Sequence, residues 1–208
     1  MRIAVDIDDV LLDFVNSFLK FHNKEYGSRM KKEDVYTFDF AKILGVPRKE
    51  VERRFLEFYK TDLFRSIKPI ECAVEGIILL HEKGHELITV SSRPEIIRKA
   101  TIEQIVEQFP ILPKDMYFSN HLYIEGNGSS KAKLCAELGV LLLIEDCFEY
   151  AIDVKKKGTD VILFDQPWNQ YEKINGIYRV GSWEKKNWWP EAVDYILHKY
   201  PLLKPQPF

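Results

Sequence analysis

The first ten residues constrain the fold of this chain most, because an apolar run passes directly into a cluster of acidic side chains. Residues 2–5 read Arg-Ile-Ala-Val, and Asp6, Asp8 and Asp9 follow with only Ile7 between them. Such a run is typical of a central parallel strand, which is covered on both faces. A buried charge is costly, so we expect the strand to end here. The carboxylates would then lie at the carboxyl edge of an open α/β sheet, where ligands bind.

The spacing of these acids indicates what they could bind. Asp6 and Asp8 lie two residues apart, so in extended backbone their side chains point the same way. Two converging carboxylates favour a bound cation or a shared proton between them. The alternative is an acidic turn that merely follows a strand.

Strands and helices alternate along the second part of the chain. We expect strands at 2–7, 86–91, 116–119, 140–144, 161–164 and, at an edge, 177–180. We expect helices at 73–83, 95–108 and 190–199, one capped by Ser129 or Ser130 that runs to Gly139, and one after the strand at 140–144 that ends near Lys157 and Gly158. Residues 126–128 should form a turn. Alternation of this kind is typical of βαβ units, so the sequence predicts an α/β fold with a central parallel sheet flanked by helices.

The interval from 15 to 70 has a different character, because it contains helical patterns but no convincing strand. Gly27 would end its first helix, and Pro47 suits the first turn of another. We therefore expect two units: an α/β core domain of residues 1–14 and 71–208, and a small helical cap of residues 15–70 inserted after the first strand.

Composition excludes several classes of partner. The formal net charge of −2 gives no electrostatic reason to expect a nucleic acid polymer. The longest apolar runs are too short to span a membrane, and the chain enters a strand at once, so we expect no signal peptide. Three cysteines without metal-site spacing fit reduced thiols in a cytoplasmic protein.

Polar residues follow several of the predicted strands. The groups are Ser91, Ser92 and Arg93 after the second strand, Glu145 and Asp146 after the strand at 140–144, and Lys131 and Lys133 at the start of the preceding helix. Each group alone is typical of a turn or of a solvated helix start. Because the carboxyl ends of parallel strands share one edge of a sheet, we expect the groups to converge.

The converging set suits phosphoryl transfer. Asp6, Asp146 and a backbone carbonyl would offer Mg²⁺ the hard oxygen ligands that it prefers. Asp6 could attack a phosphate ester and form an aspartyl-phosphate, while Asp8 could protonate the leaving oxygen and later deprotonate the water that hydrolyses the intermediate. Further contacts to the phosphoryl group would come from Ser91, the amide of Ser92, and Lys131.

The same residues resemble four motifs of the haloacid dehalogenase (HAD) superfamily of phosphohydrolases. In chain order they are Asp6-Ile7-Asp8-Asp9-Val10, Ser91 after the apolar run 87–90, Lys131 within 130–135, and Glu145-Asp146 after 141–144. Within the superfamily the chain is most similar to the 5′(3′)-deoxyribonucleotidase-like group. The matching features are Leu11, Asp13, Phe14, the helical cap, the segment 163–169, Arg179, Val180 and Trp183.

The resemblance implies a Rossmann-like HAD core and a Mg²⁺-dependent phosphatase. In it Asp6 would be the nucleophile and Asp8 the acid and base, with the metal held by Asp6, the carbonyl of Asp8, and Asp146. Phe14 would lie near a base pocket. The resemblance is also compatible with a homodimer.

Three residues depart from the pattern of that group. Asp9 replaces a glycine or another small residue, and Glu145 replaces the first acid of the acidic pair. Arg93 stands where deoxyribonucleotidases tend to have proline, so it either contacts the substrate phosphate or packs. Lys133 is the alternative to Lys131 as the motif lysine.

The substrate that we expect is a small phosphate ester, most simply a nucleoside or deoxynucleoside monophosphate. The alternatives are a sugar phosphate or another non-nucleotide ester, or a protein that keeps the fold for binding and catalyses nothing. Aromatic rings can stack on a nucleobase, and the candidates in or near the cap are Phe14, Tyr36, Phe38, Phe40 and Phe64. The same rings could equally form the core of the cap.

Overall fold

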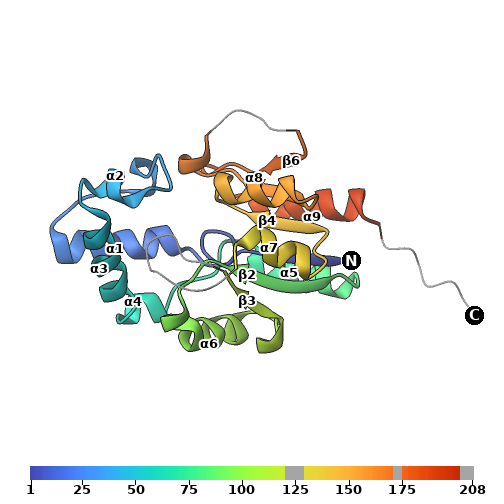
Figure 1. Ribbon diagram of the computed structural model, residues 1–208, viewed down its shortest axis with the longest axis horizontal. Helices are drawn as coiled ribbons and strands as arrows, with labels where there is room; N and C mark the ends of the chain where they lie inside the picture. Colours follow the sequence, from blue (N-terminus) through green and yellow to red (C-terminus); the bar gives the residue numbers. More distant parts are fainter. Residues whose placement is uncertain (120–128, 171–174, 202–208) are drawn as a thin grey trace, which may run out of the picture.

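The sheet has six parallel strands in the order β3-β2-β1-β4-β5-β6. The computed structural model describes residues 1–119, 129–170 and 175–201, so the expected turn at 126–128 lies outside the described residues. The strands are β1 Arg2–Val5, β2 Glu86–Ser91, β3 Met116–Phe118, β4 Leu142–Glu145, β5 Asp160–Phe164 and β6 Ile177–Val180. The α/β fold with a central parallel sheet is therefore confirmed (Figure 1).

Helices cover both faces of the sheet because successive strand residues point to opposite sides. Ile3 and Val5 join one core with residues of α5 Ala73–Glu82, α6 Arg98–Gln108 and α9 Trp188–Lys199. Ala4 points to the other face and joins a second core with residues of α7 Lys131–Glu137 and α8 Phe148–Lys156. The sheet is thus the middle of three layers.

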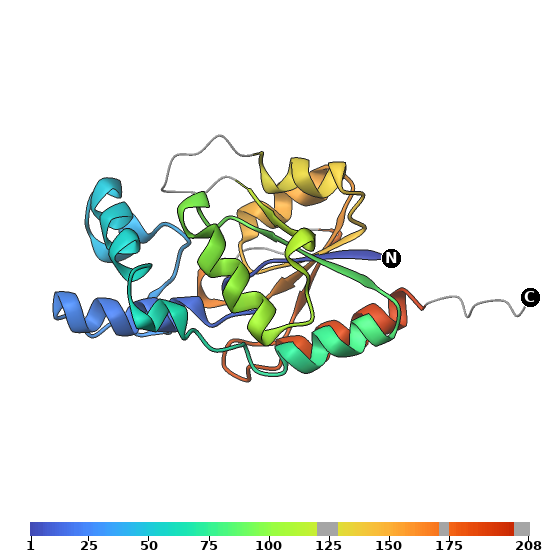
Figure 2. The ribbon, with the colours of Figure 1, turned by 90° about the horizontal axis from the view of Figure 1, so that it is seen from below.

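Helices α5 and α9 lie side by side beneath the sheet (Figure 2). Their contact depends on Gly76, where an added Cβ would lie 2.5 Å from the Trp189 ring. Only glycine permits this approach. None of the helices in the described ranges is long and apolar enough to cross a bilayer.

Some element boundaries differ from the expected ones. Strand β4 begins at Leu142 rather than at 140, because the backbone N–H of Val140 still donates to Cys135 O in the turn that ends α7. Helix α1 begins at Phe14. Leu11 lies in the turn before this helix, where its N–H donates to Ile7 O at 2.9 Å. The turns before β4 and α1 are held by local backbone hydrogen bonds, which cannot be predicted from the periodicity of apolar residues.

The expected cap region is helical, and it lies beyond the carboxyl ends of the strands (Figure 1). Its elements are α1 Phe14–Tyr26, the 3₁₀ turn η1 Lys32–Asp34, α2 Phe40–Leu44, α3 Arg48–Phe58 and α4 Asp62–Arg65. Gly27 ends α1 with φ of 64°, a conformation that favours glycine. Phe18 packs against Phe55 and Phe58, with ring centroids 4.7 and 5.6 Å away.

The two connections between this region and the sheet run next to each other. Asp13 N–H donates to Lys68 O at 2.9 Å, and Ile70 N–H donates to Leu11 O at 2.8 Å. The chain therefore leaves and re-enters the α/β part at one place, close to the boundaries expected from the sequence. The division into two domains stays a prediction.

Candidate active site

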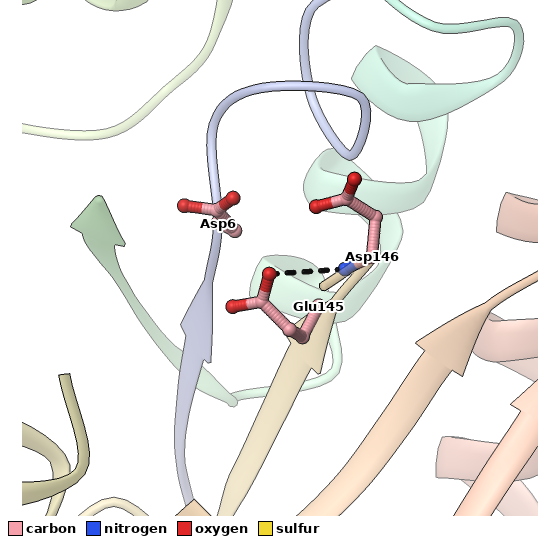
Figure 3. Close-up of side chains that lie close together, drawn as sticks. All are labelled: Asp6, Glu145 and Asp146. Atoms are coloured by element: carbon pink, nitrogen blue, oxygen red, sulfur yellow. Dashed lines mark hydrogen bonds between the residues drawn. The ribbon is translucent and has the colours of Figure 1, made fainter. Parts of the chain in front are cut away.

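The candidate site lies where the strand order reverses, between β1 and β4. In open parallel sheets this switch point opens a crevice at the carboxyl ends of the strands. Asp6 follows β1, and its N–H donates to Ile144 O of β4 at 3.0 Å. Carboxylate oxygens of Asp6, Glu145 and Asp146 lie within 4.8 Å of one another, and Figure 3 shows the three side chains close together at the ends of two neighbouring strands.

Lys131 lies between two of these acids and is buried. Its Nζ is 2.9 Å from Asp6 Oδ1 and 2.6 Å from Glu145 Oε2. Burial alone would lower the pKa of Lys131, but the charges of the two carboxylates outweigh it and hold the pKa well above its usual value. Lys133, the alternative, points to the surface beside Glu137. The structure brings Lys131, and not Lys133, into the cluster.

Both carboxylate oxygens of Glu145 have partners. Its Oε1 accepts the backbone N–H of Asp146 at 3.1 Å and that of Cys147 at 3.0 Å, and its Oε2 accepts a hydrogen bond from Lys131 Nζ at 2.6 Å. Glu145 therefore contacts both Lys131 and the loop that carries Asp146.

Asp146 is held by two residues that are not among the site residues expected from the sequence. Trp168 donates from Nε1 to Asp146 Oδ2 at 2.9 Å, and Asn169 donates from Nδ2 to the Asp146 carbonyl at 2.6 Å. Both residues are buried and belong to the 3₁₀ turn η4 Pro167–Asn169. The signal in the sequence was their place after the strand at 161–164, which also ends at the site edge.

The acids of the cluster fit a hard divalent cation. Burial raises the pKa of Asp6 to about 7 against the opposing charge of Lys131. Burial, followed by the charges of Glu145 and Asp6, raises the pKa of Asp146 well above its usual value. Asp6 Oδ1 is buried and accepts no hydrogen bond of good geometry from the described residues. A cation held by Asp6 and Asp146 would relieve this crowding of negative charge.

Asp8 lies outside this carboxylate cluster but lines the same cavity. Its side chain is 27% exposed and pairs with Arg93, whose Nη2 is 2.7 Å from Asp8 Oδ1. Arg93 itself is buried. The contact to a substrate phosphate expected as one option for Arg93 therefore has no open path, and its guanidinium binds protein groups instead.

Asp9 adopts φ of 55°, the left-handed region that favours glycine. Two contacts stabilise it there: Lys32 Nζ lies 2.9 Å from Oδ1, and the N–H of Val15 donates to Oδ2 at 3.0 Å. Burial raises the pKa of Asp9 to about 6. The departure from a small residue at this position thus adds a buried link between the core and η1.

Ser91 and Ser92 line the cavity at the end of β2. The Oγ of Ser91 accepts the N–H of Arg93 at 3.2 Å, and the Oγ of Ser92 lies 2.9 Å from that of Ser119. Both serines therefore line the same cavity as Asp6, Asp8 and Asp146, and their contact with a substrate phosphate stays a prediction.

Aromatic rings also line the cavity. They are those of Phe14, Phe38, Phe40, Phe55, Tyr59 and Tyr150, and the Tyr150 ring centroid lies 4.8 Å from Lys131 Nζ, next to the acidic cluster. Phe14 lines the cavity as the resemblance implies, although it is almost buried and packs on Phe58 at 5.5 Å. Tyr36 is 64% exposed, and neither it nor Phe64 lines the cavity. Tyr150, which comes from α8, was not expected.

Known proteins match this chain over most of its length. The family model of the 5′ nucleotidase, deoxy (Pyrimidine), cytosolic type C proteins matches residues 1–192. A 5′(3′)-deoxyribonucleotidase of Bacillus subtilis is 28% identical over 185 residues, which cover 88% of this chain and 94% of the relative. A nucleotidase of Clostridium acetobutylicum is 24% identical over 185 residues, covering 89% and 91%.

Solved structures share the fold. A haloacid dehalogenase-like hydrolase from Streptococcus pneumoniae superposes with a TM-score of 0.63 at 12% identity, covering 94% of this chain and 97% of the other. A HAD family hydrolase from Deinococcus radiodurans, with bound phosphate and sodium, gives 0.59 at 15% identity, covering 87% and 90%. The chain therefore belongs to the family of 5′ nucleotidase, deoxy (pyrimidine), cytosolic type C proteins within the HAD superfamily, and it is a hydrolase of phosphoric monoesters.

Proposed function

We propose that this chain hydrolyses a nucleoside or deoxynucleoside monophosphate with the help of Mg²⁺, through an aspartyl-phosphate on Asp6. The observation that carries the proposal is the position of Asp6. It is buried beside Lys131 and close to Asp146, and it lines a cavity that aromatic rings also line. The family match and the names of the relatives support the same reaction and the nucleotide substrate.

The proposed chemistry proceeds in two transfers. An Asp6 oxygen attacks phosphorus, the bond from phosphorus to the leaving oxygen breaks, and Asp8 gives that oxygen a proton. Water then attacks the same phosphorus, Asp8 takes the proton from the water, and the bond from phosphorus to Asp6 breaks. The products are the alcohol and inorganic phosphate, and Asp6 and Asp8 return to their starting states.

The remaining residues of the cluster stabilise charge. Lys131 neutralises part of the charge on Asp6 and on the phosphoryl group, and Glu145 keeps Lys131 in place. Trp168 donates to the carboxylate of Asp146 and fixes its position, and Asp6 and Asp146 are the residues that would hold Mg²⁺. The bound ion would supply positive charge that offsets the phosphate dianion.

The aromatic rings that line the cavity support a substrate whose leaving group carries a planar base. Phe38 and Tyr150 meet edge to face at 6.1 Å, and both line the cavity. Stacking on such rings stabilises a base by about 1–3 kcal/mol. A sugar phosphate would leave this surface without a partner, which is why we favour a nucleotide.

The test is phosphate release from a panel of nucleoside monophosphates and sugar phosphates with Mg²⁺. We expect nucleotides to be the best substrates and Asp6→Asn to release no phosphate above background. Asp153→Asn is the matched control, because Asp153 lies on the surface of α8 beside Lys156. Full activity of Asp6→Asn would rule out Asp6 as the nucleophile. Faster phosphate release from sugar phosphates than from nucleotides across the panel would rule out a nucleotide as the preferred substrate.

A further inference from the structure

The carboxylate of Asp8 is hydrogen-bonded to a buried arginine, Arg93. Arg93 donates from Nε to both carboxylate oxygens at 3.1 Å and from Nη2 to Oδ1 at 2.7 Å. Charge-assisted bonds with this forked geometry fix the plane of a carboxylate as well as its position. Oδ1 of Asp8 accepts two of these hydrogen bonds and Oδ2 accepts one, so Oδ2 has more room for a further partner.

The other end of the guanidinium is anchored as well. Its Nη1 donates to Gln104 Oε1 at 2.7 Å and to Thr101 Oγ1 at 3.3 Å, both on α6. Gln104 in turn donates to the carbonyl of Phe64 in α4, and the Phe64 ring lies 5.2 Å from the Arg93 guanidinium carbon. The guanidinium of Arg93 is therefore held at both ends, by Asp8 at one end and by Gln104 and Thr101 at the other.

Arg93 does not line the cavity, whereas Asp8 does. The side chain of Arg93 is 1% exposed, so a substrate in the cavity meets Asp8 and not the guanidinium behind it. Any influence of Arg93 on a reaction in the cavity must pass through Asp8 or through the local fold.

We propose that Arg93 is a positioning residue for proton transfer, which holds the Asp8 carboxylate so that Oδ2 faces the leaving oxygen of the ester. The inference rests on the proposed function. Asp8 gives its proton as the bond from phosphorus to the leaving oxygen breaks, and Arg93 forms and breaks no covalent bond. An ester whose leaving group is stable as an anion, such as p-nitrophenyl phosphate, depends little on this proton. An alkyl ester such as a nucleoside 5′-monophosphate depends on it strongly.

The experiment compares kcat/KM for these two kinds of ester, because kcat/KM reports the first transfer. We expect Arg93→Met to lower kcat/KM for the nucleotide about 10²-fold or more, the usual contribution of a positioned acid. For p-nitrophenyl phosphate we expect a loss at least tenfold smaller. Arg98→Met is the control, since Arg98 lies nearby, pairs with Glu95 at the surface and does not line the cavity. We expect it to leave both values unchanged.

A second comparison uses Asp8→Asn as background. If Arg93 acts through Asp8, Arg93→Met adds no further loss to Asp8→Asn, since residues that act as a unit are not additive. Arg93→Lys keeps the buried charge but not the fork, so it carries the same comparison should Arg93→Met fail to fold. We expect Arg93→Lys to restore the melting temperature more fully than the nucleotide rate.

Three results would overturn the inference. The first is an equal loss of kcat/KM on both esters in Arg93→Met. The second is a double variant, Asp8→Asn with Arg93→Met, in which the two losses of kcat/KM multiply. The third is a raised KM with unchanged kcat, which would indicate a direct contact between Arg93 and the phosphate. A wild-type protein that hydrolyses no phosphate ester with Mg²⁺ would overturn the proposed function first and this inference with it. An active wild type together with any of the three results would overturn this inference alone.

Discussion

The acidic cluster next to the cavity and the aromatic rings that line the cavity are built on opposite principles. The floor, defined as Asp6, Lys131, Glu145 and Asp146, consists of buried charges that are fixed by one another and by backbone groups. The roof, defined as Phe14, Phe38, Phe40, Phe55 and Tyr59, consists of rings that come from the helices and loops between β1 and α5. Removal of one partner from a buried charge cluster is strongly destabilising, because it leaves the other charges uncompensated. Packed rings tolerate substitutions of similar volume better. The floor therefore suits chemistry, and the roof suits selection of the substrate.

Removal of the metal gives the sharpest test of the floor. We expect a chelator to bring phosphate release to background and Mg²⁺ to restore it. Because a ligand that binds only the folded state stabilises it, by about 2.7 kcal/mol at a hundredfold excess over Kd, Mg²⁺ should also raise the melting temperature. Asp146→Asn should lose this shift. Asp194→Asn is the control, since Asp194 on α9 lies far along the chain from the floor and outside the cluster.

The next test removes the positive charge of the floor. We expect Lys131→Met to lower kcat about 10²–10³-fold, the range for loss of one preorganised electrostatic group. The variant should also unfold at a lower temperature, because Asp6 and Glu145 lose their partner. Lys133→Met should match the wild type in both measurements. Activity of Lys131→Met within tenfold of the wild type would show that the floor does not work through this charge.

The roof should respond in KM rather than in kcat. Phe38 is half-buried and lines the cavity, so we expect Phe38→Ala to raise KM for a nucleotide on the order of tenfold, the weight of one stacked ring. KM of Phe38→Ala for glycerol phosphate should stay unchanged. Tyr36→Ala is the control: because the Tyr36 ring is exposed, KM for the nucleotide and KM for glycerol phosphate should both stay unchanged. A drop in kcat for both substrates would mean that floor and roof are not separable.

The smallest effect is on stability without metal. The pKa values of Asp6 and Asp9 are raised to about 7 and about 6, well above about 3.9 in an unfolded chain. Between those limits the folded state binds more protons than the unfolded state. The free energy of unfolding should therefore fall as the pH rises from about 4 to about 7. Melting curves in a chelator check this, and Asp6→Asn should show a shallower fall. A rising melting temperature over this range would contradict it.

Much of the fold and the floor could be predicted from the sequence, because both depend on local pattern. Apolar runs give the strands, and the residue after each run falls at one edge of the sheet, as Asp6 and Asp146 do. The burial of Lys131 could be favoured over that of Lys133 because Lys131 begins the helix that follows Ser130.

The pairings between distant side chains could not be predicted. Arg93 and Asp8 are 85 residues apart in the chain, and nothing in a turn sequence says which acid a buried arginine will meet. The link from Lys32 to Asp9 and that from Trp168 to Asp146 have the same origin. Such contacts follow from how helices and loops dock on the sheet, which depends on the whole packed structure.

The adjacent backbone contacts of Asp13 with Lys68 and of Leu11 with Ile70 have a further consequence. A segment whose ends meet can change its length or be replaced with little loss of entropy and little strain on the scaffold. We expect that a transplant of a foreign helical segment between these two points would leave the carboxylates of the floor in register. New specificities could then be grafted on without changes to the acidic cluster.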